Sequence, residues 1–104
     1  MGHPIEINDL VDRAYKTAKE HGFHDPMPTF GDLVALCHSE LSEMLEEFRK
    51  DGHTKTEAIE EEAADVCIRL FDMAGIYGWD LQQAIYNKMA KNQEREYRHG
   101  GKVI

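Results

Sequence analysis

Two acidic pairs within helical patterns are the residues best suited to chemistry in this chain. Glu40 and Glu43 stand three residues apart, and Glu62 and Asp65 repeat that spacing. Residues three apart lie on one side of a helix, so each pair presents two carboxylates together. Two such helices packed antiparallel would bring four carboxylates together, and these would repel one another where water is excluded. A divalent cation such as Mg²⁺, which prefers oxygen ligands, is the simplest compensation.

The elements that must position these acids follow from the spacing of apolar residues. Apolar side chains recur every three or four residues in four segments, which predicts an all-α fold. The expected helices cover residues 6–21, 30–50, 55–77 and 80–96. Stop signals stand at Gly22, Gly52 and Gly78, and Asp80 can cap the last helix. With a length of 104 residues, we expect one four-helix bundle-like domain covering residues 1–104.

One acid of the second helix lies within the apolar arc of that helix. At about 100° per residue, Glu40 falls near Leu33 and Leu36, and Glu43 lies at the edge of the arc. A carboxylate in an apolar stripe is unfavourable unless a partner compensates for its charge. This position favours a bound cation. The alternative is that both acidic pairs belong to solvated helix faces, as runs of charge often do.

The charge of the chain limits its partners. The net charge is −8, and half of the 20 acidic residues lie between Glu40 and Asp65. This balance argues against a nucleic-acid polymer or an anionic membrane as partner. A phosphate substrate stays compatible with it, because a metal ion can reverse the local potential. We expect no signal peptide, and no apolar run approaches the ~18 residues of a membrane span.

The two cysteines indicate a reducing compartment. Cys37 and Cys67 lie far apart, within helical patterns, and form no Cys-x-x-Cys motif. We expect both to be free, buried and packed as small hydrophobes. A cytoplasmic location fits this expectation.

The acidic pairs and their surroundings resemble those of a known family. The shared features are Glu40-Leu41-Ser42-Glu43 and Glu62-Ala63-Ala64-Asp65 in order, with Gly22-Phe23, Phe30-Gly31, Ala64-Asp65-Val66 and the tail Tyr97-Arg98-His99-Gly100-Gly101-Lys102. Together they resemble the MazG-type nucleoside triphosphate pyrophosphohydrolases, within the all-α NTP pyrophosphatase superfamily. The resemblance covers nearly the whole chain and is closest to short single-domain members.

This resemblance implies hydrolysis of ribo- or deoxyribonucleoside triphosphates to the monophosphate and pyrophosphate, as nucleotide-pool house-cleaning. It implies Mg²⁺ as cofactor, with Mn²⁺ as a substitute, and a homodimer or homotetramer whose sites lie near the subunit interface. The metal ligands carried over are Glu40, Glu43, Glu62 and Asp65. The substrate-binding residues carried over lie on the last helix and in the tail: Lys88, Asn92, Arg95, Arg98 and His99.

The chemistry of phosphoryl transfer agrees with this acidic site. Such reactions mainly need positioning and charge stabilisation, so no serine or cysteine nucleophile is required. We expect Glu40 and Glu43 to be catalytic, with Glu40 favoured as the acceptor of a proton from water attacking the α-phosphorus. Lys88 would stabilise the departing pyrophosphate.

Two other functional readings stay open at this point. The chain could be a non-catalytic helical module that binds a nucleotide or a partner protein, or a purely structural dimerisation bundle. Phe23, Phe30 and Trp79 are candidates for stacking on a base, although packing is favoured for Trp79.

Overall fold

The computed structural model describes residues 4–95, and these form four helices and no strand. The helices are α1 (Ile7–Glu20), α2 (Phe30–Asp51), α3 (Glu57–Tyr77) and α4 (Leu81–Glu94). The all-α prediction is confirmed, and each helix begins and ends within two residues of its expected bounds.

Local signals explain where the helices begin and end. The Thr29 and Thr56 side chains accept hydrogen bonds from backbone N–H groups three residues on, and these caps start α2 and α3. Asp80 caps α4 in the same way, as its position predicts. Gly52 and Gly78 end α2 and α3 with φ angles of 73° and 69°, which favour glycine.

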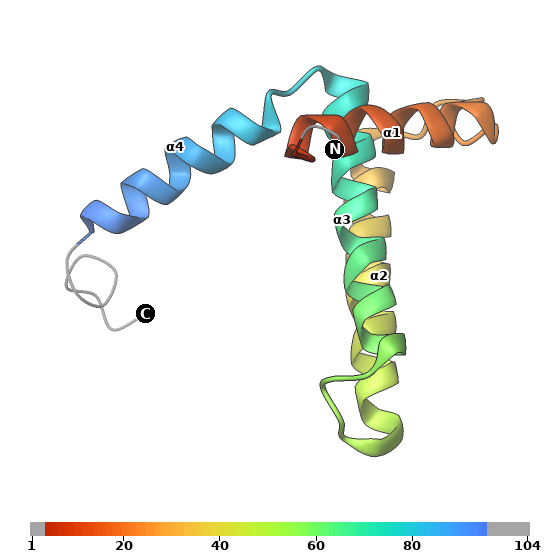
Figure 1. Cartoon of the computed structure of the whole chain (residues 1–104). Helices are drawn as coiled ribbons and strands as arrows, with labels where there is room; N and C mark the ends of the chain where they lie inside the picture. The colour runs from red at the N-terminus through yellow and green to blue at the C-terminus, as the bar shows by residue number, and fades with distance from the viewer. Residues whose placement is uncertain (1–3, 96–104) are drawn as a thin grey trace.

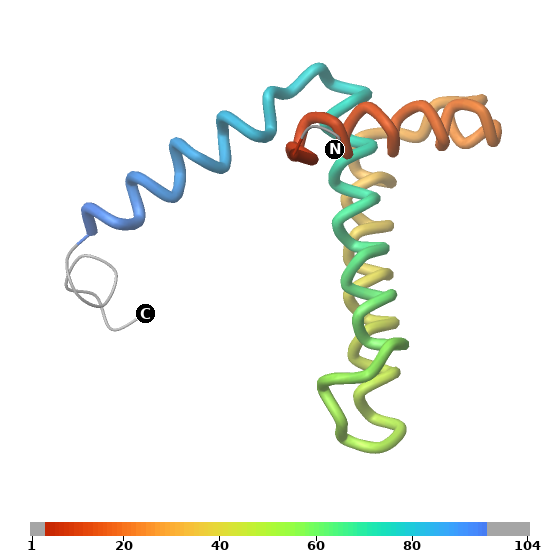
Figure 2. The backbone as a smooth tube through the Cα atoms, in the orientation of Figure 1, coloured from red at the N-terminus to blue at the C-terminus, as the bar shows by residue number. Residues whose placement is uncertain are grey.

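Helices α1 and α2 both pack against α3, whereas α4 extends away from this group. Helices α2 and α3 lie side by side and antiparallel, and α1 crosses the far end of this pair (Figure 1). Helix α4 points away from the other three, as the backbone tube in Figure 2 shows. Gln82 donates hydrogen bonds to the side chains of Glu6 and Asn8 and accepts one from the Asn8 backbone N–H, and these bonds attach the first turn of α4 to the start of α1. The arrangement is therefore a three-helix body with an extended arm.

A glycine sets the close approach of α1 to α3. A Cβ atom added to Gly75 would lie 2.5 Å from the Cβ of Tyr15. Only a residue without a side chain fits there, so α1 can lie directly on the backbone of α3. This contact fixes the position of α1 beside the acidic pairs.

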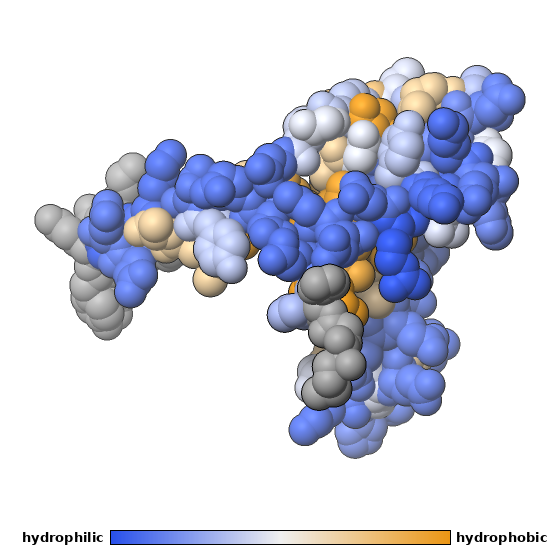
Figure 3. Space-filling model, turned by 45° about the horizontal axis from the view of Figure 1, so that its top comes forward, coloured by the Kyte–Doolittle hydropathy of each residue, from blue (hydrophilic) through white to orange (hydrophobic). Residues whose placement is uncertain are grey.

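The core of the described chain is thin. Its buried apolar residues are Val11, Leu33, Cys37, Met73 and Ala74, and no large side chain is fully enclosed. The radius of gyration is 16.5 Å, against about 13 Å for a compact domain of this length. Figure 3 shows apolar surface between polar residues along the arm. The exposed large apolar side chains include Leu41, Leu45, Phe48, Ile68, Leu70, Ile85, Tyr86 and Met89.

Two further expectations have structural outcomes. Both cysteines are free, but only Cys37 is buried; Cys67 is exposed, so the expectation of a buried thiol is wrong there. Cys67 faces the gap between α3 and α1 rather than the α2–α3 contact, because it lines a cavity there. Among the described residues, no helix is long and apolar enough to cross a membrane.

Candidate metal centre and adjoining cavity

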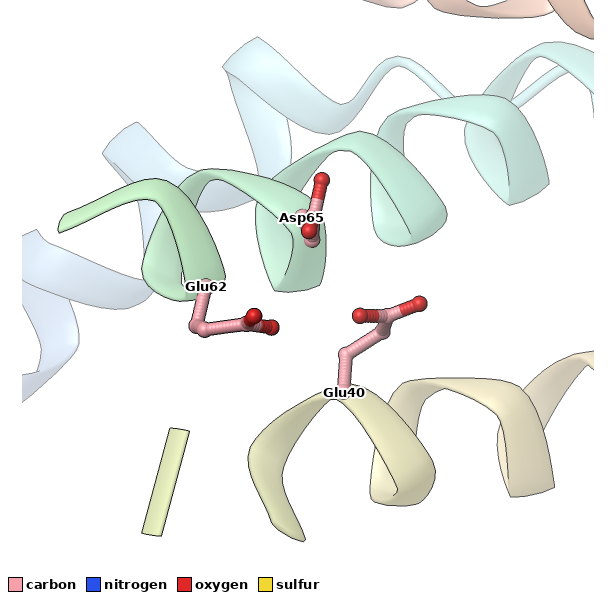
Figure 4. A group of neighbouring side chains, drawn as sticks. All are labelled: Glu40, Glu62 and Asp65. Carbon is pink, nitrogen blue, oxygen red and sulfur yellow. The ribbon is translucent and has the colours of Figure 1, made fainter. Parts of the chain in front are cut away.

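Three of the four predicted ligands converge between α2 and α3. Glu40 projects from α2, Glu62 extends toward it from α3, and Asp65 lies beside them on α3 (Figure 4). Each offers a carboxylate oxygen, and these atoms all lie within 4.8 Å of one another. The antiparallel packing of α2 and α3 produces this convergence, because it sets the two i, i+3 pairs opposite each other. Glu43 lies outside this trio but lines the same cavity as Glu40 and Asp65.

The charges of this acidic cluster are only partly compensated. The Nε atom of Arg69 lies 3.3 Å from Oε1 of Glu40, which is 9% exposed. Oε2 of Glu62 is sealed from solvent and has no hydrogen-bond partner in the described chain. An enclosed carboxylate oxygen without a partner is costly, and the neighbouring carboxylates add repulsion. A hard divalent cation fits this donor set, because every ligand is an oxygen.

Two basic side chains border the cluster without replacing a cation. The guanidinium of Arg69 lies 5.2 Å from the centroid of the Phe23 ring, which fixes it beside Glu40. On the other side Lys50 lies 2.7 Å from Glu47. The pKa of Lys50 is raised, first by its hydrogen bond with Glu47 and further by charges that include Glu62. The positive charge of Lys50 therefore persists near the cluster, although its hydrogen bond goes to Glu47.

Cys37 is the buried thiol beside the cluster. Cys37 packs against Met73, with 3.8 Å between the two sulfur atoms. Burial raises the pKa of the Cys37 thiol, partly offset by the charge of Arg69. The protonated form of the thiol is therefore favoured. This is compatible with the expected phosphoryl-transfer chemistry, which requires no thiolate.

A cavity of about 960 Å³ opens from the acidic cluster between α1 and α3. Glu40, Glu43 and Asp65 line one part of it, which we call the acidic end. The walls are largely apolar and come from both helices: Leu10, Ala14, Ala18, Ile68 and Phe71. A volume of this size and a mainly apolar lining with a few charged groups are typical of small-molecule sites.

A second buried acid lines this cavity and was missed from the sequence. Asp72 lies on α3 seven residues after Asp65, and its Oδ1 atom is 2.9 Å from Nε2 of His24. The side chains of His24 and Asp72 are only 8% and 6% exposed. The available signal was an aspartate next to the apolar run Met73–Ala74, one heptad beyond Asp65 on the same helix face. Its histidine partner, 48 residues away, had no such signal.

The predicted substrate-binding residues lie elsewhere in the single chain. Lys88, Asn92 and Arg95 lie on α4 or just after it, are exposed, and do not line the cavity. Helix α4 points away from α2 and α3 (Figure 1), so one chain does not bring these residues to the acidic cluster. Arg98 and His99 lie outside the described residues.

The aromatic candidates for base stacking separate in the structure. Phe23 lines the cavity. Phe30 and Trp79 instead pack with Tyr77 in an exposed cluster, with Tyr77 and Trp79 stacked at 5.5 Å. Trp79 is 42% exposed and so is not a core residue, and its place in an interface stays a prediction.

Comparison with known proteins adds no assignment: no protein-family model matches the chain, and no match is found among curated proteins or solved structures. The function must therefore be argued from the acidic cluster and its cavity.

Proposed function

We propose that this chain is a Mg²⁺-dependent nucleoside triphosphate pyrophosphohydrolase of the MazG type. The observation that carries the proposal is the convergence of Glu40, Glu62 and Asp65, with oxygens within 4.8 Å of one another at the end of a nucleotide-sized cavity. The sealed, unpaired oxygen of Glu62 favours a bound cation over a solvated helix face. Mn²⁺ would fit the same oxygen ligands.

Each part of the site has a role in cleaving the bond between the α- and β-phosphates. Glu40, Glu62 and Asp65 would hold the cation, which supplies neutralisation of phosphate charge when bound. Glu43 lines the cavity beside these ligands and is exposed, so it can accept a proton from the attacking water. Glu40 is the other candidate for this role, but its Oε1 atom is already engaged by Arg69. The cavity between α1 and α3 would hold the nucleoside.

A second copy of the chain would complete both the core and the site. In one chain the apolar side chains of α4 stay uncovered, with Tyr86 and Met89 65% and 63% exposed. Leu45 and Phe48 of α2 also stay exposed, so α2 and α4 offer apolar faces to a partner. Docking of the partner's α4 near the acidic end would bring Lys88 and Asn92 of the partner subunit to the phosphates. A homodimer or homotetramer follows from this proposal.

The decisive experiment measures pyrophosphate release from a panel of nucleoside triphosphates with and without Mg²⁺. The wild type is compared with Glu62→Gln, which removes the unpaired charge, and with Glu46→Gln as the matched control. Glu46 is an exposed acid of α2 that pairs with Arg49 alone among residues 4–95. We expect Mg²⁺-dependent release of pyrophosphate and monophosphate, lost in Glu62→Gln and kept in Glu46→Gln. Release of orthophosphate would place the cleavage at another bond and contradict the proposal.

The alternative is a non-catalytic module that binds nucleotides or a partner through the same cavity. Its favouring observation is that the candidate phosphate-binding residues lie away from the acidic cluster in one chain. A folded wild type that binds nucleotide with Mg²⁺ but releases no product from any substrate would support this alternative.

A further inference from the structure

We propose that Asp72 is the specificity-determining residue of this site and that it selects nucleotides whose base carries an exocyclic amino group. This inference rests on the proposed function, because it treats the cavity as the place of the nucleoside. It concerns a buried pair, His24–Asp72, that has no part in holding the cation or activating water.

Only one of the two carboxylate oxygens of Asp72 has a partner among the described residues. The Oδ1 atom is occupied by Nε2 of His24 at 2.9 Å. The Oδ2 atom has no hydrogen-bond partner in the described chain, yet it is not among the sealed polar atoms, unlike Oε2 of Glu62. Asp72 lines the cavity and its side chain is only 6% exposed, so we infer that Oδ2 is the acceptor that it offers to this largely apolar space.

Asp72 lies one heptad along α3 from the acidic end of the cavity. Asp65 and Asp72 are seven residues apart on α3, which places them on the same face with about 10 Å of helix rise between them. This separation suits a nucleotide whose α-phosphate lies at the acidic end and whose base reaches past Ile68 and Phe71. The edge of the base would then meet Asp72.

A carboxylate at this position distinguishes bases by the groups on their hydrogen-bonding edge. A carboxylate accepts hydrogen bonds and cannot donate them, so it pairs with an amino group and is repelled by a carbonyl oxygen. Cytosine carries an amino group where uracil carries a carbonyl, and adenine does so where hypoxanthine carries a carbonyl. Because a buried polar site strongly disfavours an analogue that leaves its group unpaired, Asp72 selects against the deaminated members of both pairs.

His24 is a positioning residue in this scheme. Its ring lies against Tyr15, with 5.0 Å between the ring centroids, and its Nε2 donates to Asp72. This contact holds Oδ1 and so leaves Oδ2 as the oxygen available to a ligand. In an Asp72→Asn variant the same donor would hold the amide oxygen, and the amide N–H₂ group would face the cavity. The preference should then reverse toward carbonyl-bearing bases.

The test measures kcat/KM for dCTP, dUTP, dATP and dITP with Mg²⁺ in the wild type, Asp72→Asn and the control Glu46→Gln. We expect the wild type to prefer dCTP over dUTP and dATP over dITP by about 10- to 100-fold, as for a hydrogen bond to a charged group. Asp72→Asn should reverse both ratios, and Glu46→Gln should leave them unchanged. A wild type without these preferences would overturn the inference, whether or not Asp72→Asn folds, and so would an equal loss on all four substrates in a folded variant.

Binding separates this inference from the proposed function. If no triphosphate is hydrolysed, calorimetric titration of the same protein with dCMP and dUMP still tests the role of Asp72. Preferential binding of dCMP, reversed in Asp72→Asn, would support the base-selecting role while the proposed reaction fails. Equal binding, or none, would overturn the role of Asp72.

Discussion

Two carboxylates of helix α3, Glu62 and Asp72, differ in what compensates for their charge. Glu62 has a sealed oxygen with no partner and stands beside two other acids. Asp72 is held by His24 and has no second carboxylate among its hydrogen-bond partners. The first arrangement favours a bound cation. In the second, Oδ1 of Asp72 has a partner, whereas Oδ2 of Asp72 and the buried Nδ1 of His24 have none among the described residues. We infer that an acid without a partner favours a cation, whereas an acid held by a histidine can still pair with a ligand.

The largest expected effect comes from making the same substitution at two positions on α3. Asp65→Asn removes a ligand from the acidic cluster, so we expect kcat to fall by about 10³-fold, the scale of losing a key electrostatic group. Asp72→Asn leaves the cluster intact, so hydrolysis of carbonyl-bearing dUTP or dITP should persist. Steady-state pyrophosphate release measures both variants. If Asp72→Asn is as inactive as Asp65→Asn on every substrate while still folded, the division between the two acids is wrong.

The next effect separates the two ends of the cavity by their dependence on a second copy. Met89→Glu places a charge on the apolar face of α4, where Met89 is 63% exposed in one chain. We expect the assembly to dissociate, and hydrolysis to fall by about 10²-fold because the partner's Lys88 is misplaced. Binding of dCMP over dUMP should persist, because His24 and Asp72 belong to one chain.

Light scattering after size-exclusion chromatography measures the mass of the Met89→Glu variant. Gln93→Glu serves as its matched control, because it also changes the charge by one unit, at an exposed polar position of α4. A wild type that is monomeric and fully active would contradict the role given to the second copy.

A third prediction concerns the sign of stability changes without metal. Glu62→Gln removes one of three neighbouring charges, so it should raise the free energy of unfolding by about 1 kcal/mol in EDTA. Asp72→Asn weakens the contact with buried His24 and should lower it by about 1–3 kcal/mol. Adding Mg²⁺ should stabilise the wild type and Asp72→Asn but not Glu62→Gln. Urea denaturation in EDTA and in Mg²⁺ measures these free energies of unfolding. If both variants change stability in the same direction in EDTA, the distinction between Glu62 and Asp72 is wrong.

The sequence was sufficient for features that depend on near neighbours. Apolar spacing and the caps at Thr29, Asp80, Gly52 and Gly78 are local, so the four helices could be predicted closely. The convergence of Glu40 with Glu62 and Asp65 followed as well, because it needs only two i, i+3 pairs on antiparallel helices.

Features set by distant partners could not be predicted in the same way. Helical periodicity shows that α4 has an apolar face but not which surface covers it, so the extended arm was not foreseen. Cys67 lies in the apolar pattern of α3, yet it is exposed because it lines the cavity beside α1. The pairing of His24 with Asp72 joins a loop to a helix across 48 residues, and no spacing rule connects them.

The smallest expected effect uses the two thiols as reporters of the cavity. Cys67 lies between Asp65 and Asp72 and lines the cavity, whereas Cys37 is buried and its pKa is raised by burial. At pH 7 a thiol reagent should therefore label Cys67 rapidly and Cys37 only on unfolding, because the thiolate reacts and access is required. Mg²⁺ with dCTP should slow the labelling of Cys67 several-fold, and Mg²⁺ with dUTP should slow it less at the same concentration. Cys67→Ser is the control, since it should remove the fast phase. Equal protection by both nucleotides would indicate that the base does not reach Asp72, whereas none by either would place the nucleotide outside this cavity.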